Sequence, residues 1–284
     1  MIRSLLTLFL MFAFFVNPLA AQELSGTLQK IKKSGVIKIG YRQSQPPMSF
    51  MGKNGEPQGY SIDLGQEIAS AVQTKIGQKI KIKYVPVTAA NRFTALAENK
   101  IDILCGSATK TLSRSEVVDF TQLTFVTGAS FMTLHGKDIR NNFAGKKLGV
   151  VKDTTTKDAL QKMLQETGTK ADVVLLDSTA AGIKALRDKT IDAFAADQVV
   201  LIGLALTSEN PNDFSILPNL FTYEPFALAV RRNDADFRLV ADRVISDLYR
   251  SKKILKIYDK WFGKFSARRS MAFDALIQLN AIPE

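Results

Sequence analysis

Short hydrophobic runs alternate with amphipathic segments along most of the chain. Residues 36–40 and 101–104 are short apolar runs, and residues 80–84 alternate strictly between apolar and polar side chains, so we expect three strands. Residues 62–73 carry apolar side chains at helical spacing, and residues 91–98 predict a second helix. Strands that alternate with helices favour parallel pairing in βαβ units. The predicted fold class is therefore α/β.

One segment of the chain recurs further along the sequence. Residues 95–102 (ALAENKID) and 185–192 (ALRDKTID) share Ala-Leu and Ile-Asp at identical spacing, and each is typical of a helix end, a polar turn and a strand start. Chance recurrence is the alternative, because both dipeptides are common. We interpret residues 118–134 and 220–230 as two extended segments that carry the chain out of a first lobe and back. The sequence thus predicts two similar α/β lobes with a hinge and a ligand cleft between them. The predicted boundaries place residues 22–125 and 222–284 in lobe 1 and residues 126–221 in lobe 2.

The N-terminus has the three-part pattern of a secretory signal peptide. Arg3 supplies the positive charge, and residues 5–16 form an almost unbroken apolar run. The small residues Ala20 and Ala21 follow, as expected before a cleavage site. The apolar run is shorter than the ~20 residues that cross a bilayer, which argues against the alternative of a membrane anchor. We therefore expect cleavage of residues 1–21 after Ala21, and a mature protein that works in the periplasm.

Composition and charge narrow the classes of function. The chain has 284 residues, of which 46% are hydrophobic and 23% charged, and this is ordinary globular composition. Cys105 is the one cysteine and His135 the one histidine, which leaves little material for a zinc site or a Ser-His-Asp triad. We expect no metal and no cofactor. The net charge of +11 would suit nucleic acid or a membrane surface, but the lysines are spread over helices without interleaved aromatic residues, so we expect no nucleic-acid partner.

Basic and hydroxyl residues follow the ends of the predicted strands in the first lobe. Arg42 follows the first strand, and Arg92 opens a helix. Ser107 and Thr109 follow a third strand, with Arg114 shortly after them. Ligands of open α/β sheets bind beyond the carboxyl ends of the strands. An arginine binds a carboxylate through two parallel hydrogen bonds that a lysine cannot form, so these arginines point to an anionic ligand.

The second lobe offers a threonine run and an aspartate at similar places. Thr154, Thr155 and Thr156 precede a helix expected over residues 157–164. Free N–H groups at a helix start suit an anionic ligand, and plain N-capping is the alternative. Asp197 follows an apolar strand, where its carboxylate suits a ligand ammonium, and a solvated loop aspartate is the alternative.

An ordered series of short motifs runs through the chain. The series comprises Gly40-Tyr41-Arg42, Gly59-Tyr60-Ser61-Ile62-Asp63-Leu64, Thr88 with Asn91-Arg92, Cys105-Gly106-Ser107-Ala108-Thr109, Arg114 and Lys260-Trp261-Phe262. It resembles the periplasmic amino-acid-binding proteins of ABC uptake systems (solute-binding protein family 3), above all their glutamate/aspartate-binding branch, from about residue 28 to 265. The resemblance implies a type II periplasmic-binding-protein fold, closure of two lobes over an amino acid, delivery to an ABC permease in the inner membrane, and no catalysis. It also leads us to expect a monomer.

The resemblance implies how the main-chain groups of an amino acid are held. Arg114 matches the arginine that binds the ligand α-carboxylate, helped by Thr109 and by the helix start at Thr154 and Thr155. Ser107 matches an acceptor of the α-ammonium.

The resemblance also assigns roles to Asp197 and to the residues that would bind the ligand side chain. Asp197 matches the second acceptor of the α-ammonium. Arg42 and Arg92 match residues that answer an acidic side chain, and Thr156 falls beside the threonine pair. The implied ligand is therefore an acidic or polar amino acid similar to glutamate or aspartate.

Three positions depart from the glutamate/aspartate pattern. Ala89 stands where that branch usually has a serine, Thr179 where it has a histidine, and Met48 where a phenylalanine often packs on the ligand. A buried ligand group without its partner costs ~1–3 kcal/mol, which is enough to change the preferred amino acid. The alternative function is an exported cyclohexadienyl (prephenate or arogenate) dehydratase on the same fold, for which Asp197 and Glu224 are the candidate acids.

Overall fold

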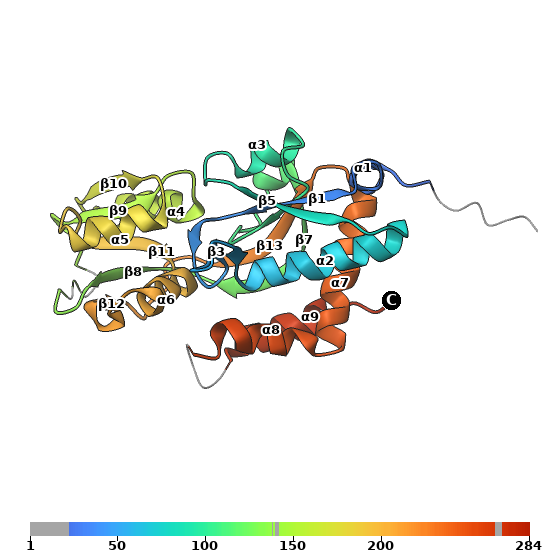
Figure 1. The fold of residues 1–284 in the computed structure, drawn as a ribbon. Coiled ribbons are helices and arrows are strands. Elements are labelled where there is room, and N and C mark those ends of the chain that lie inside the picture. Colours follow the sequence, from blue (N-terminus) through green and yellow to red (C-terminus); the bar gives the residue numbers. More distant parts are fainter. Residues whose placement is uncertain (1–22, 138, 140–141, 265–268) are drawn as a thin grey trace, which may run out of the picture.

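The computed structural model describes residues 23–137, 139, 142–264 and 269–284, and the predicted signal peptide lies outside these residues. Two α/β lobes, each built on a five-stranded sheet, lie side by side (Figure 1). None of the helices in the described ranges combines the length and the hydrophobicity of a transmembrane span. The predicted fold class, with two lobes, is confirmed.

Lobe 1 is built on a mixed sheet in the order β5-β1-β6-β13-β7. Its strands are β1 (Val36–Tyr41), β5 (Lys81–Pro86), β6 (Ile103–Cys105), β7 (Val118–Thr127) and β13 (Glu224–Arg231). Its helices are α1 (Gly26–Ser34), α2 (Tyr60–Ile76), α3 (Arg92–Ala97), α7 (Ala235–Arg250), α8 (Lys253–Phe262) and α9 (Met271–Asn280), with the short 3-10 helix η1 (Arg114–Glu116). Ile37 and Ile39 pack in the cluster that contains α1, α2 and α7, whereas Leu104 packs with α3 in a second cluster. The two faces of the sheet are thus covered by different helices.

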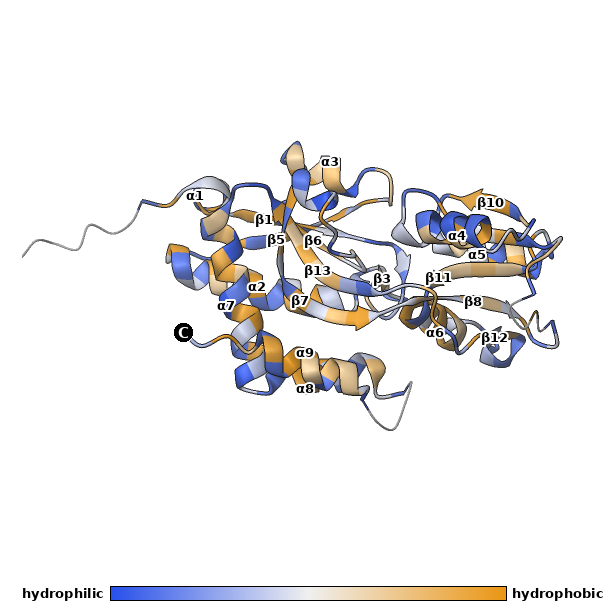
Figure 2. Cartoon of the chain, turned by 180° about the vertical axis from the view of Figure 1, so that it is seen from behind, coloured by the Kyte–Doolittle hydropathy of each residue, from blue (hydrophilic) through white to orange (hydrophobic). Residues whose placement is uncertain are grey.

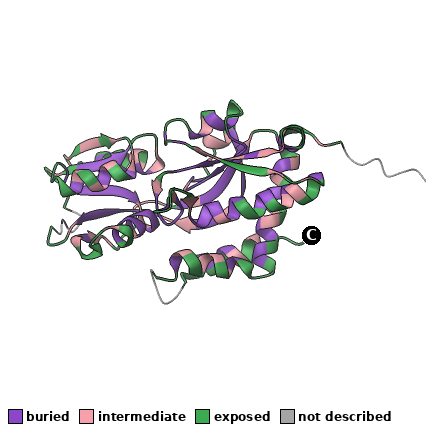
Figure 3. Cartoon of the chain, viewed as in Figure 1, coloured by how far each residue is buried: buried purple, intermediate pink, exposed green. Residues whose placement is uncertain are grey.

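Lobe 2 is built on a second sheet in the order β10-β9-β11-β8-β12. Its strands are β8 (Ala129–Leu134), β9 (Lys147–Val151), β10 (Asp172–Leu176), β11 (Ala193–Asp197) and β12 (Phe214–Ile216). Its helices are α4 (Thr155–Glu166), α5 (Thr179–Arg187), α6 (Gln198–Thr207) and the short 3-10 helix η2 (Pro211–Asp213). Figure 2 shows the hydrophobic residues concentrated in the strands, while α4 is hydrophilic outside. In Figure 3 the central strands of both sheets are largely buried, whereas the edge strands β5 and β10 are exposed or intermediate.

Strand direction separates the local strands from the returning ones. Strand β1 pairs parallel with β5 and β6, and β9 pairs parallel with β10 and β11, as the alternating pattern predicts. The expectation of parallel pairing is wrong for β7, β8, β12 and β13, which form antiparallel pairs. Strands β7 and β13 connect with the other lobe instead of following a βα unit, so their direction depends on where the chain crosses.

The chain crosses between the lobes twice, and the crossings touch each other. One crossing runs from β7 through Gly128 into β8, and the other runs from β12 through Thr222 into β13. A Cβ atom added to Gly128 would lie 2.3 Å from the carbonyl oxygen of Thr222, so only glycine permits this approach. Strand β7 continues to Thr127 and β13 begins at Glu224. The lobe boundaries at 125/126 and 221/222 stay a prediction.

The repeated sequence segment makes the same structure in both lobes. In lobe 1 the Asp102 N–H donates to the Lys38 carbonyl at 2.8 Å, and the Lys38 N–H donates back to Asp102 Oδ2 at 2.8 Å. In lobe 2 Asp192 and Lys147 make the same pair of bonds, also at 2.8 Å and 2.8 Å. The shared Ile-Asp pairs are therefore structural and not a chance recurrence.

The isoleucine of each repeat explains a glycine in the neighbouring strand. A Cβ atom added to Gly40 would lie 2.4 Å from Cδ1 of Ile101, and one added to Gly149 would lie 2.5 Å from Cδ1 of Ile191. Each glycine leaves room for the isoleucine against its own strand, β1 in lobe 1 and β9 in lobe 2. Both lobes thus contain the same close contact between a glycine of one strand and an isoleucine of the repeated segment.

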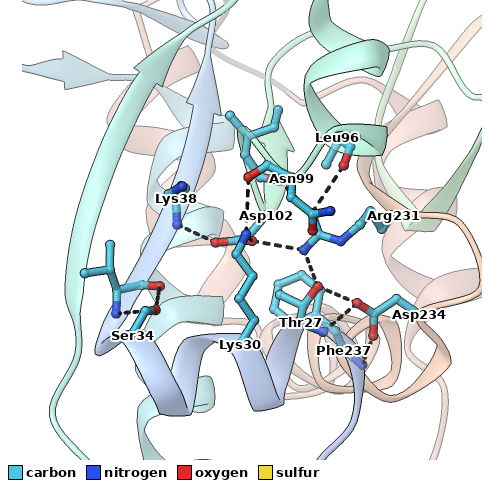
Figure 4. Close-up of polar contacts among 12 residues, drawn as sticks. Thr27, Lys30, Ser34, Lys38, Leu96, Asn99, Asp102, Arg231, Asp234 and Phe237 are labelled. Atoms are coloured by element: carbon cyan, nitrogen blue, oxygen red, sulfur yellow. Dashed lines mark hydrogen bonds and ion pairs between the residues drawn. The ribbon is translucent and has the colours of Figure 1, made fainter.

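Asp102 differs from Asp192 because cations surround it. Asp102 is fully buried, and its Oδ1 accepts from Lys30 at 2.7 Å and from Arg231 at 3.0 Å (Figure 4). Arg231 also donates to Thr27 at the start of α1. The network joins α1, the start of β6 and the end of β13. It lies at the end of the sheet opposite the carboxyl ends of β1 and β6, which carry the candidate site.

The C-terminal helices cover the end of β7. Phe125 of β7 stacks on Phe262 at 4.9 Å between ring centroids and contacts Phe273 of α9 at 5.5 Å. Trp261 donates through Nε1 to Asp63 of α2 at 2.8 Å. The tail therefore packs on lobe 1, as the apolar spacing of residues 271–277 predicts.

We expect Asp102→Asn to lower the free energy of unfolding by about 3 kcal/mol, because it leaves two partly buried cations without their counter-charge. Asp192→Asn is the matched control: it changes the same backbone bond at an exposed residue, and we expect a loss of about 1 kcal/mol or less. Urea unfolding of both variants measures the difference. Equal losses would show that the ion pairs of Asp102 contribute nothing beyond the backbone bond.

Candidate functional site

A small sheet of lobe 1 reaches lobe 2 and closes the space between them. It consists of β2 (Ser44–Gln45), β3 (Ser49–Met51) and β4 (Pro57–Gln58). Ser44 Oγ lies 3.0 Å from Thr179 Oγ1 of α5, and the Thr179 hydroxyl also donates to the Ser44 carbonyl. A Cβ atom added to Gly203 of α6 would lie 2.1 Å from the Pro46 carbonyl oxygen. The lobes are thus in direct contact, and the structure is a closed form.

Three arginines of lobe 1 converge on the region between the lobes. Arg42 follows β1 and is 8% exposed, and Arg92 opens α3 and is 5% exposed. Thr88 and Asn91 exchange hydrogen bonds at 2.8 and 3.2 Å, which starts α3 and holds Arg92 at its first residue. The Arg92 guanidinium then donates across the cleft to the carbonyl of Asp153 in lobe 2 at 3.0 Å.

The third guanidinium, that of Arg114, shares an aromatic support with Arg92. Arg92 lies 4.5 Å and Arg114 lies 5.4 Å from the ring centroid of Phe93. Arg114 also donates to the carbonyl oxygen of Thr109 at 2.8 Å. These contacts hold two cations side by side at the mouth of the same cleft.

The positive charges of the three arginines lie close enough to affect a pKa among them. The pKa of Arg92 is lowered to about 9, first by burial and then by the charges of Arg114 and Arg42. Burial lowers the pKa of Arg42 to about 10, against the opposing charge of Asp197. A buried cluster of like charges is unfavourable unless an anion enters it. The geometry of lobe 1 therefore prepares an anion site.

Asp197 supplies an opposite charge from lobe 2. It ends β11, and its Oδ1 is one of two buried side-chain oxygens in the described residues that have no hydrogen-bond partner. The pKa of Asp197 is raised to about 8, first by burial and then by the charge of Glu224, while the three arginines act in the opposite direction. An unpaired buried acceptor of this kind suits a ligand that brings its own donor, such as an ammonium group.

The threonine run at the start of α4 divides into different tasks. Thr154 is the N-cap: its Oγ1 accepts from the Lys157 N–H at 3.2 Å, so the capping alternative holds for this hydroxyl. The Thr155 hydroxyl donates to Glu224 at 2.8 Å, and Thr156 lines a small cavity together with Asp197.

The hydroxyls of lobe 1 also have partners inside the cleft. The Thr109 hydroxyl donates to the same Glu224 oxygen as Thr155. The Ser107 hydroxyl donates to Gln45 Oε1 at 2.9 Å, and Gln45 lines the cavity beside Asp197. The structure therefore brings all nine candidate residues to the facing surfaces of the two lobes. Their roles toward a ligand stay predictions.

Two cleft residues escape the sequence analysis as binding residues. Gln45 stands in a turn-rich stretch without periodicity, and Glu224 starts a strand and is weighed only as an acid of the alternative enzyme. Glu224 is 1% exposed and contacts residues of both lobes. A buried carboxylate at a strand start has no local sequence signature, so only the meeting of the lobes shows its place.

Residues 37–264 match the bacterial extracellular solute-binding proteins, family 3. The chain belongs to this family. It is 31% identical over 263 residues to the L-glutamate/L-aspartate-binding protein of Pseudomonas aeruginosa, covering 91% of this chain and 87% of that protein. It is 30% identical to the glutamate/aspartate import solute-binding protein of Salmonella typhimurium, covering 83% of this chain and 79% of that protein. The crystal structure of the cysteine-binding protein of Campylobacter jejuni superposes with a TM-score of 0.73 at 28% identity, covering 87% of this chain and 97% of that one.

The positions that depart from the glutamate/aspartate pattern of the family are all buried here. Ala89 is 4% exposed, Thr179 is 3% exposed and Met48 is fully buried. Thr179 uses its hydroxyl to bind Ser44, so it joins the lobes instead of offering an imidazole-like partner to a ligand. Met48 packs in the main hydrophobic cluster of lobe 1. Thr179 and Met48 therefore have structural contacts of their own, and the effect of the three positions on a ligand stays a prediction.

Two other residues have plain structural roles. Cys105 is fully buried next to Gly65, and burial raises the pKa of its thiol well above the ordinary range. His135 Nδ1 lies 3.5 Å from Ser215 Oγ at an exposed position of lobe 2. Neither residue lies among the groups of the cleft.

The raised pKa of Asp197 predicts a dependence of stability on pH. The closed, ligand-free protein holds a proton on Asp197 up to a pKa of about 8, whereas the unfolded chain releases it near 4. The folded state thus binds more protons between these values, and the contribution of Asp197 to the free energy of unfolding falls as pH rises from 4 to 8. Asp197→Asn removes this contribution.

Urea unfolding of the ligand-free wild type and of Asp197→Asn at pH 5, 6, 7 and 8 checks this dependence. We expect the variant to gain stability relative to the wild type as pH rises. A constant difference between the two proteins over this range would contradict the assignment.

Proposed function

We propose that this protein captures an acidic amino acid, similar to glutamate or aspartate, between its two lobes and delivers it to an ABC permease. The observation that carries the proposal is the convergence of three arginine side chains on the cleft, each with a pKa lowered by burial. Such a cluster gains from an anion that neutralises it inside the closed cleft.

The charge balance of the cleft favours an amino acid with two carboxylates. Arg42, Arg92 and Arg114 carry three positive charges, and Asp197 and Glu224 carry two negative charges when ionised. One positive charge is left over, and an amino dicarboxylate with its ammonium has a net charge of minus one. A neutral amino acid would leave the excess charge buried, which is unfavourable.

The arrangement of donors and acceptors supports the same ligand. Arg114 and the free N–H groups at the start of α4 suit the α-carboxylate, since an anion is stabilised at a helix N-terminus. Asp197 and Ser107 suit the α-ammonium. Arg42 and Arg92 then remain for the side-chain carboxylate. Ala89 has no side-chain donor and the Thr179 hydroxyl is used by Ser44, so the arginines carry the recognition of the side-chain carboxylate in this proposal.

The remaining features follow from membership of the family. The relatives are named as binding proteins of import systems, which supports a small-molecule ligand and a permease as partners. We propose a periplasmic protein, exported by residues 1–21, that acts as a monomer without catalysis. Nucleic acid plays no part in this proposal.

The dehydratase alternative rests on one observation. Burial raises the pKa of Asp197 to about 8, so its carboxyl carries a proton at neutral pH in the closed, empty cleft, as a general acid would. Incubation of the protein with prephenate tests this function. Consumption of prephenate that Asp197→Asn abolishes would favour the enzyme, and an unchanged concentration would reject it.

We expect the wild type to bind L-glutamate or L-aspartate more tightly than L-glutamine or L-asparagine in isothermal titration calorimetry. Arg42→Ala should weaken the acidic ligands by roughly 10- to 100-fold, since a hydrogen bond to a charged group contributes ~1.5–3 kcal/mol. It should weaken the neutral ligands much less. Arg187→Ala, an exposed arginine of lobe 2, is the matched control and should change neither.

Two results would contradict the proposal at different levels. Tighter binding of the neutral amino acids by the wild type would reject the acidic ligand while keeping an amino-acid-binding protein. An equal loss for both ligand classes in Arg42→Ala would remove Arg42 from the side-chain subsite.

A further inference from the structure

We infer that Glu224 is a positioning residue that sets the direction of the hydrogen bonds in the cleft. It accepts hydrogen bonds from the hydroxyls of Thr109 and Thr155, and so leaves both hydroxyl oxygens as acceptors for a ligand ammonium. The inference rests on the proposed binding of an α-amino acid, but not on which amino acid is bound.

Glu224 lies where the two lobes meet. It is the first residue of β13, directly after the second crossing, and it is 1% exposed. Its Oε2 accepts from Thr155 Oγ1 at 2.8 Å and also from Thr109 Oγ1. Thr109 belongs to lobe 1, whereas Thr155 is the first residue of α4 in lobe 2. One carboxylate oxygen therefore joins the two faces of the cleft.

The number of protons decides what the threonines offer. A hydroxyl has one proton and two lone pairs, and an ionised carboxylate only accepts hydrogen bonds. Thr109 and Thr155 each donate their one hydroxyl hydrogen bond to Glu224. The 3.4 Å between their hydroxyl oxygens is therefore a contact of two acceptors. Neither hydroxyl then has a proton for a ligand carboxylate. This differs from the role that the family resemblance implies for Thr109, since only its backbone N–H is left for a carboxylate.

A further acceptor stands in the same site. Asp197 Oδ1 is buried without a partner, and the charge of Glu224 acts on both Asp197 and Arg114. The two hydroxyl oxygens add acceptors to Asp197 and Ser107, the residues proposed above for the ammonium group, whose N–H groups need acceptors. Arg114, which donates to the Thr109 carbonyl, lies beside these acceptors, so an ammonium and a carboxylate can be bound next to each other.

The bridge also makes this polarity depend on closure. Thr155 moves with lobe 2, so Glu224 holds both hydroxyls at once only when the lobes are together. The acceptor set for an ammonium is therefore complete in the closed form that the structure shows.

The test compares amino acids with analogues that lack only the ammonium group. L-glutamate is paired with glutarate, L-aspartate with succinate, and L-glutamine with glutaramate, by calorimetry on the full mature chain. We expect Glu224→Gln to weaken the amino acids by roughly 10- to 100-fold, because the amide donates to the threonines and turns them from acceptors into donors. The deamino analogues should change little, so the ratio of the two affinities falls.

Three further variants keep the test sharp. Glu209→Gln removes an exposed glutamate of lobe 2 and should leave every ratio unchanged. Thr109→Ser keeps the hydroxyl and should retain the preference for amino acids, whereas Thr109→Val should reduce it. Glu224→Gln combined with Thr109→Val should lose less than the sum of the two single losses, since both act on the same hydroxyl.

The outcomes separate this inference from the proposed ligand class. An equal loss for amino acids and analogues in Glu224→Gln, or no loss, would overturn the positioning role. A wild type that prefers no amino acid over its deamino analogue would also overturn it. Preference for L-glutamine over glutaramate, with L-glutamate unbound, would reject the acidic ligand alone, and Glu224 would then be judged on the glutamine pair.

Discussion

The rest of the site depends on one constraint: two buried guanidinium groups, those of Arg42 and Arg92, and the partly buried one of Arg114 lie between the lobes. Burial lowers the pKa of Arg92, and so do the charges of Arg114 and Arg42. Opposite charge reaches this point from Asp197 in lobe 2 and from Glu224 after the second crossing. This excess of buried positive charge is the physical basis of the proposed anionic ligand.

Closure in turn depends on how closely the two lobes can approach. Gly128 lets the two crossings touch, and Gly203 lets α6 meet the carbonyl of Pro46. Below the crossings, Phe125 of β7 packs on Phe262 and Phe273 of the C-terminal helices. Strand β7 thus has an aromatic support in lobe 1, while polar groups such as Arg92 and Ser44 make the hydrogen bonds to lobe 2.

The two lobes show one local solution used with different surroundings. Asp102 and Asp192 bind the neighbouring strand in the same way, and Gly40 and Gly149 admit the same isoleucine contact. Only Asp102 is fully buried, and it gains Lys30 and Arg231 as partners (Figure 4). Residues from α1 and β13 supply these cations, so the difference arises from the elements packed around the repeat in lobe 1 and not from the repeat itself.

The sequence alone determined the α/β class, the two lobes, and the nine candidate residues that line the facing surfaces, because periodicity, turn residues and strand ends are local properties of the chain. Motif order pointed to the family for the same reason. Only the tertiary structure decided the antiparallel strands, the capping role of Thr154, and the place of Gln45 and Glu224, since each depends on segments that are far apart in sequence. The direction of the threonine hydrogen bonds belongs to the same class, because a hydroxyl donates or accepts according to the neighbour that folding brings to it.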